Sequence, residues 1–131
     1  MAKKILVVDD DADILTLVEA VLSEEGYEVV TAHDGRAALE DMRAGQTPNL
    51  ILLDLAMPIM SGWEFIQQLN ESKLAPDTPI VVMTASPQVD ERVVLPLVAG
   101  HINKPFDLDD LVACAATYLG GPVPSNSRFS F

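Results

Sequence analysis

Short apolar runs alternate with amphipathic segments along this chain, and no other sequence feature constrains the fold as strongly. The two clearest runs, residues 5–8 and 50–53, are hydrophobic throughout and lack the polar alternation of a strand with one solvated face. Such runs are typical of parallel strands buried on both faces. Their alternation with helical patterns predicts an α/β fold, in which helices cover both faces of a doubly wound parallel sheet.

The helical segments are recognised by apolar residues that recur at spacings of three and four. Gly26 is expected to end the first helix, and Pro96 interrupts the fourth. In chain order, the expected strands are 4–8, 27–32, 50–53, 80–84 and 102–103, and the expected helices are 11–25, 34–42, 63–72, 89–97 and 107–118. In parallel sheets of this kind, ligands bind at the carboxyl ends of the strands.

The length of 131 residues fits one domain, predicted at 1–120, followed by a flexible tail at 121–131 that is rich in Gly, Pro and Ser.

No apolar run approaches the roughly 20 residues that span a membrane, so membrane insertion is not expected. The first residues lack the apolar region of a signal peptide. Cys114 is the single cysteine, which excludes an internal disulfide and indicates a cytoplasmic location.

The formal net charge is −12, and the eight Lys and Arg residues form no cluster in the sequence. Nucleic-acid binding depends on a basic surface, so direct contact with nucleic acid is not expected. The charge favours partners that are cationic or that bring a cation.

Acidic residues follow the two clearest apolar runs: Asp9 and Asp10 after the first, and Asp54 after the second. Three carboxylates gathered at one sheet edge repel one another unless a cation lies among them. Thr84 and Lys104 stand at the ends of two further strands. Carboxylates suit Mg²⁺, and a hydroxyl and an ammonium group suit phosphoryl oxygens. Asp54 is then a candidate nucleophile that accepts a phosphoryl group.

Four local sequences, VVDDD, LLDLAMPIMSG, MTA and NKPF, occur in this order and resemble the receiver domain of two-component response regulators over residues 3–119. The resemblance implies a CheY-like, flavodoxin-like fold with strand order 2-1-3-4-5. It also implies a signalling switch, not a turnover enzyme. A sensor histidine kinase or a histidine phosphotransfer protein would donate the phosphoryl group. The chain is expected to act as a stand-alone receiver without an output domain, through contacts with an unknown downstream protein.

The resemblance assigns a role to each site residue. Asp54 is the phosphoacceptor, and Mg²⁺ is held by Asp9, Asp10, Asp54 and the backbone carbonyl of Ala56. The phosphoryl group is bound by the Thr84 switch hydroxyl, the backbone of Ala85 and Lys104. The peptide bond before Pro105 is expected to be cis.

Two features depart from the family pattern, and two further positions bear on the lifetime of the phosphorylated state. His101 occupies the position, three residues before the lysine, where the family often has Tyr or Phe as a rotamer switch, and we expect it to respond to phosphorylation with added pH sensitivity. The stretch between Thr84 and Lys104 is about two residues shorter than usual in the family and contains two prolines, which predicts a short or displaced fourth helix. Ala56 and Ser86, two residues after the acceptor and the threonine, leave the phosphoryl lifetime open.

Other functions remain as alternatives. A Mg²⁺-dependent phosphohydrolase would carry an acid two residues after its nucleophile, where this chain has Ala56. A flavin-binding electron carrier would need a Ser/Thr/Gly-rich phosphate loop after the first strand. A degenerate receiver could serve only as an adaptor.

Some of the residues named above also have purely structural interpretations. Asp9 and Asp10 could be plain helix caps, and Asp11 is predicted to be a cap instead of a metal ligand. Cys114 is predicted to be an inert core residue.

Overall fold

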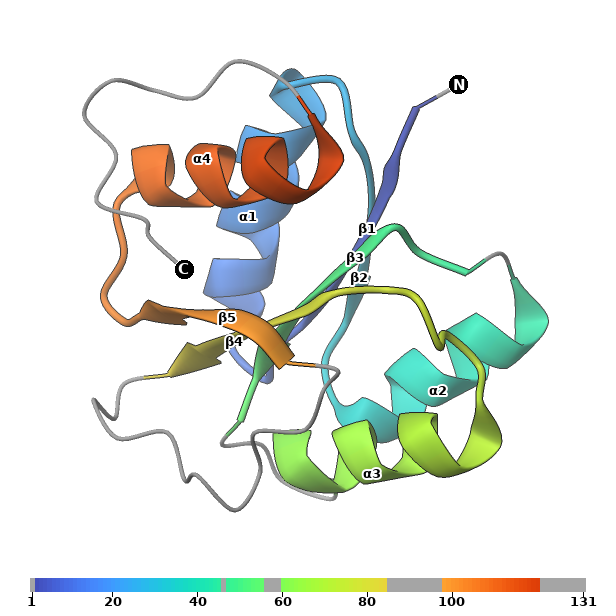
Figure 1. The fold of residues 1–131 in the computed structure, drawn as a ribbon. Helices are drawn as coiled ribbons and strands as arrows, with labels where there is room; N and C mark the ends of the chain where they lie inside the picture. The colour runs from blue at the N-terminus through green and yellow to red at the C-terminus, as the bar shows by residue number, and fades with distance from the viewer. Residues whose placement is uncertain (1, 46, 56–59, 85–97, 121–131) are drawn as a thin grey trace.

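A five-stranded parallel sheet lies between two pairs of helices (Figure 1). The computed structural model describes residues 2–45, 47–55, 60–84 and 98–120. Its elements are β1 (Lys4–Val8), α1 (Ala12–Glu24), β2 (Glu28–Ala32), α2 (Gly35–Ala44), β3 (Leu50–Asp54), α3 (Gly62–Ser72), β4 (Ile80–Thr84), β5 (Val98–Asn103) and α4 (Leu108–Leu119). The strands follow the order β2-β1-β3-β4-β5, and every neighbouring pair is parallel. The predicted fold class and strand order are confirmed.

The predicted strand at 102–103 was too short, because β5 begins at Val98. Val98 pairs with Ile80 and Gly100 with Val81, so the register shifts at Ala99. The Tyr118 hydroxyl of α4 donates a hydrogen bond of 3.1 Å to the Ala99 carbonyl. Ala and Gly are poor strand formers, so this pairing comes from the neighbouring strand and helix. The predicted helix at 89–97 and the predicted tail at 121–131 lie outside the described residues.

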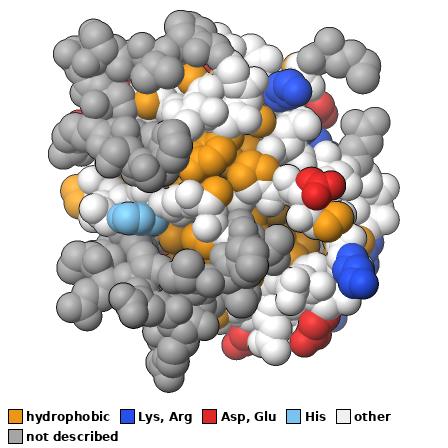
Figure 2. Space-filling model, in the orientation of Figure 1, with side chains coloured by type: hydrophobic (Ala, Val, Ile, Leu, Met, Phe, Trp, Pro, Cys, Tyr) orange, Lys and Arg blue, Asp and Glu red, His pale blue; other side chains and the backbone are white. Residues whose placement is uncertain are grey.

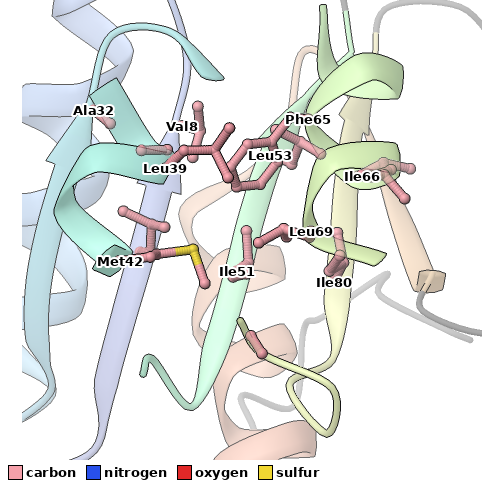
Figure 3. Packing of buried hydrophobic residues seen from close by; sticks show 14 residues of the cluster. Val8, Ala32, Leu39, Met42, Ile51, Leu53, Phe65, Ile66, Leu69 and Ile80 are labelled. Atoms are coloured by element: carbon pink, nitrogen blue, oxygen red, sulfur yellow. The ribbon is translucent and has the colours of Figure 1, made fainter. Parts of the chain in front are cut away.

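The helices divide the core into two halves. Helices α2 and α3 pack together on one face of the sheet, and α1 and α4 pack together on the other. Figure 3 shows the first half, where Leu39 and Met42 of α2 and Phe65 of α3 meet Ile51 and Leu53 of β3. Because β1 and β3 are buried on both faces, their residues contribute alternately to the two halves. The carboxyl ends of β1 and β3 thereby lie side by side at one edge of the sheet.

Short polar side chains cap the N-termini of α1, α2 and α3. The Asp11 side chain accepts the backbone N–H groups of Asp13 and Ile14, so its predicted role as a helix cap is confirmed. Asp34 caps α2, and Ser61 caps α3. Gly26 follows α1 with φ of +95°, a conformation that glycine adopts without the penalty of a Cβ atom. The first helix therefore ends where the sequence predicted.

The α1–α4 half of the core contains Cys114, which is 0% exposed. Burial raises the pKa of its thiol to about 12, because the thiolate would lose its hydration. This position confirms the prediction of a core cysteine. Among the described residues, no helix is long and apolar enough to cross a membrane.

Hydrophobic side chains are visible at the centre of the face that is turned toward the viewer in Figure 2, between the two helix pairs of Figure 1. Charged side chains lie along the right-hand margin of the same face (Figure 2).

Candidate functional site

Three carboxylates meet at the carboxyl edge of the sheet. Strands β1 and β3 are neighbours, with Val8 opposite Leu53, so Asp9 follows β1 beside Asp54 at the end of β3. A carboxylate oxygen from each of Asp9, Asp10 and Asp54 lies within 4.8 Å of one from each of the others. Asp9 is 0% exposed and Asp54 is 6% exposed, whereas Asp10 is exposed. The structure thus brings together the acids that the sequence singled out.

Backbone groups fix the orientation of Asp9. Its N–H donates to the carbonyl oxygen of Ala32 at the end of β2, at 3.1 Å. Its Oδ1 accepts the N–H of Asp11 at 2.9 Å, and Asp11 in turn caps α1. The second carboxylate oxygen of Asp9 is thereby directed toward Lys104, which donates to it. Acids that are close in the sequence therefore have different roles. Asp9 belongs to the carboxylate cluster, and Asp11 caps the N-terminus of α1.

Lys104 provides the cation at this edge. It follows β5 directly, and its Nζ donates to Asp9 Oδ2 at 2.7 Å and lies 3.5 Å from Asp54 Oδ2. Burial by itself would lower the pKa of Lys104, but the hydrogen bonds and negative charges of Asp9 and Asp54 outweigh it and raise that pKa. The ammonium group is therefore charged at neutral pH. The peptide bond between Lys104 and Pro105 is cis, as the resemblance implied.

Gly62 holds the end of β3 in place, a role that the sequence reasoning missed. A Cβ atom at Gly62 would lie 2.6 Å from the backbone oxygen of Asp54 and 2.7 Å from Cα of Leu55. The Gly62 N–H donates to the Leu55 carbonyl at 3.0 Å. The available signal was a glycine at the start of a helix, where it is less favoured than at the end. The absence of a side chain at Gly62 therefore lets α3 begin against the backbone of Asp54, and we expect Gly62 to position that residue.

The remaining predicted site residues are placed only in part. Thr84 is the last residue of β4, and its backbone pairs with Asn103, which precedes Lys104. It therefore lies at the same sheet edge as the acids. His101 pairs with Val82 and is exposed on β5. Ala56 and Ala85, whose backbone groups were expected to contact the metal and the phosphoryl group, lie outside the described residues.

The donor set fits a divalent cation. Asp9, Asp10 and Asp54 supply three negative charges, and Lys104 supplies one positive charge. The remaining negative charge and the hard carboxylate oxygens suit Mg²⁺, which takes few protein ligands and keeps positions for water or phosphate oxygens. Because Asp10 is exposed, the cluster is accessible from solvent on its side.

Known proteins are similar to this chain in sequence. A family model described as the response regulator receiver domain matches residues 5–116. The response regulator MprA of Mycobacterium tuberculosis is 43% identical, in an alignment that covers 99% of this chain and 56% of that protein. The chain therefore spans little more than half the length of such relatives.

Two solved structures extend the similarity. The chemotaxis protein CheY4 of Vibrio cholerae superposes with a TM-score of 0.81 at 31% identity, over 91% of this chain and 100% of that chain. The response regulator TrrA of Thermotoga maritima, solved in complex with Mg²⁺ and BeF, has a TM-score of 0.78 at 33% identity, over 89% of this chain and 99% of that chain. The strand order, the acid cluster and the sequence similarity all indicate the same family. This chain belongs to the response regulator receiver domain family.

Proposed function

We propose that this receiver is a phosphorylation-dependent switch in which Asp54 accepts a phosphoryl group from a phosphohistidine. The donor is a sensor histidine kinase or a histidine phosphotransfer protein. The observation that carries the proposal is the contact of Lys104 with both Asp9 and Asp54 beside the exposed Asp10. A cation held among carboxylates is suited to bind an incoming phosphoryl oxygen.

In the proposed reaction, a carboxylate oxygen of Asp54 attacks the phosphorus atom and forms an acyl phosphate. The phosphorus–nitrogen bond breaks, and its electron pair returns to the donor imidazole. Lys104 Nζ, 3.5 Å from Asp54 Oδ2, donates to a phosphoryl oxygen. The Thr84 hydroxyl and the Ala85 backbone N–H are the proposed further donors. Asp9, Asp10, Asp54 and the Ala56 carbonyl would hold Mg²⁺, which would supply the charge neutralisation that phosphoryl transfer needs.

The phosphorylated receiver is proposed to signal in the cytoplasm through contacts with a downstream protein, and to catalyse only its own phosphorylation and dephosphorylation. Direct contact with nucleic acid is not part of the proposal, given the net charge of −12. Membrane insertion is not part of it either, because no apolar run approaches the roughly 20 residues that span a membrane. Action without an output domain stays a prediction.

Phosphorylation of the wild-type chain by acetyl phosphate tests the proposal. Intact-protein mass spectrometry is expected to show one added phosphoryl group in Mg²⁺ and none in EDTA. Asp10→Asn keeps the buried acids but removes one exposed metal ligand, so about tenfold more Mg²⁺ should be needed for half-maximal labelling.

Glu71→Gln is the matched control, because Glu71 is an exposed acid on α3, on the other side of the sheet from α1. It should leave the Mg²⁺ requirement unchanged. Absence of any label on the wild type at saturating Mg²⁺ would contradict the proposal and favour a degenerate receiver that acts only as an adaptor.

His101 is proposed to change its rotamer on phosphorylation, because it is exposed on β5 beside β4, the strand that ends in Thr84. Binding of the phosphoryl mimic beryllofluoride with Mg²⁺ should shift the imidazole NMR peaks of His101. The peaks are assigned by their loss in His101→Phe, and the same shift should be missing in Asp54→Asn. Unshifted His101 peaks in a protein that binds beryllofluoride would refute the switch role.

A further inference from the structure

The thioether of Met60 lies where the starts of two helices meet. Met60 directly precedes Ser61, the N-cap of α3. A Cβ atom added at Gly35, the first residue of α2, would lie 3.0 Å from Met60 Sδ and 3.2 Å from Cβ of Phe65 in α3. The sulfur therefore packs between α2 and α3, against a position that has no side chain of its own.

Met60 combines this packing with access from solvent. It is only partly buried, at the margin of the core half that α2 and α3 cover. The other methionines that the structure describes, Met42 and Met83, are 7% and 0% exposed. Cys114 is 0% exposed, and its thiol pKa of about 12 leaves almost no reactive thiolate at neutral pH. Among the sulfur-containing side chains of the described residues, that of Met60 is thus the most open to a small solute.

The chain connects Met60 closely to the proposed acceptor. Gly62 donates its N–H to the Leu55 carbonyl at 3.0 Å, and a Cβ atom on it would lie 2.6 Å from the backbone oxygen of Asp54. Ser61, the cap of α3, is the one residue between Met60 and Gly62. A displacement of Met60 is therefore transmitted over two residues to the backbone at the end of β3.

We propose that Met60 is an oxidation site, through which hydrogen peroxide slows phosphorylation of this receiver. The proposal rests on the proposed function, since it assumes that Asp54 is the acceptor. A lone pair of Met60 Sδ attacks one oxygen of the peroxide, so that an S–O bond forms and the O–O bond breaks. The attacked oxygen gives its proton to the displaced hydroxide, which leaves as water. Sulfur is oxidised by two electrons, and the peroxide is reduced.

The sulfoxide changes the polarity of the side chain where its surroundings are apolar. Burying a polar group without a hydrogen bond is unfavourable, so the oxidised side chain is expected to leave the space between α2 and α3. The start of α3 then moves, and with it Gly62 and the backbone of Asp54. A methyl group at Gly35 would shift the thioether but leave it apolar, so the side chain would stay in place. Methionine sulfoxide reductases reverse this oxidation.

Peroxide treatment of the full chain, ended with catalase, tests the site. Peptide mass spectrometry is expected to show an added oxygen on Met60 before Met42 or Met83. Labelling by acetyl phosphate should then slow about tenfold, less than the roughly hundredfold that a misplacement of about 1 Å can cost. The fluorescence of Trp63, the single tryptophan, should change with the same time course, because it lies in the first turn of α3. Methionine sulfoxide reductases A and B with dithiothreitol should restore the labelling rate.

Met60→Leu keeps an apolar side chain and cannot form a sulfoxide, so its labelling rates before and after peroxide should be equal. Met57→Leu is the matched control, because Met57 is three residues earlier in the chain and lies outside the described residues. It should lose labelling after peroxide as the wild type does. Full labelling of a wild-type chain oxidised at Met60, or an equal loss in Met60→Leu, would overturn the proposal. Absence of labelling before peroxide treatment would instead remove the proposed function, and the oxidation proposal with it.

Discussion

Asp54→Asn is expected to abolish phosphorylation, both by acetyl phosphate and by a phosphohistidine donor. The amide has nearly the shape of the carboxylate but lacks the nucleophilic oxygen that would form the acyl phosphate. Intact-protein mass spectrometry after acetyl phosphate treatment in Mg²⁺ should show one added phosphoryl group on the wild type and none on the variant. The neighbouring acid Asp9 is not expected to replace Asp54 as acceptor, because one of its oxygens accepts the Asp11 N–H and the other accepts from Lys104.

Folding controls make this result interpretable. The variant keeps the bond between Lys104 and Asp9 and loses one of three clustered negative charges. Its thermal unfolding midpoint in EDTA should therefore be no lower than that of the wild type. Equal labelling of Asp54→Asn and wild type would show that another residue accepts the phosphoryl group, and would refute the acceptor assignment.

Gly62→Ala is expected to lower the free energy of unfolding by about 2–3 kcal/mol and the rate of acetyl phosphate labelling about a hundredfold. The added methyl group would lie 2.6 Å from the Asp54 backbone oxygen and 2.7 Å from Cα of Leu55. Backbone atoms cannot rotate away as a side chain can, so the end of β3 must move. Urea unfolding and labelling kinetics measure the two effects.

Gly35→Ala is the matched comparison at the start of another helix. Its nearest contacts would be Sδ and Cγ of Met60, at 3.0 and 3.1 Å, and Cβ of Phe65, at 3.2 Å. The Met60 side chain is flexible, so the loss of stability should be about 1 kcal/mol or less, with little change in labelling. If Gly62→Ala labelled at the wild-type rate, the positioning role of Gly62 would be wrong even if its stability fell.

Much of the fold was predictable because its signals are local in the chain. Continuous apolar runs predicted buried parallel strands, and Asp11 and Gly26 marked the two ends of α1. The segment before Ile102 carries no such signal. Its extended conformation depends on pairing with β4 and on the Tyr118 hydroxyl, which arrives from α4. Contacts between distant residues overrode weak local preference there.

The chemical groups of the site can be read from the amino-acid sequence: acids that end two apolar strands, a lysine after a third, and a threonine at the end of another. Their order also identified the family and the role expected of Asp54. The pairing of these groups depends on the folded chain, because Lys104 contacts Asp9 from 95 positions away in the sequence and Gly62 lies against the backbone of Asp54. Strand order sets such distances, and strand order arises from packing of the whole sheet.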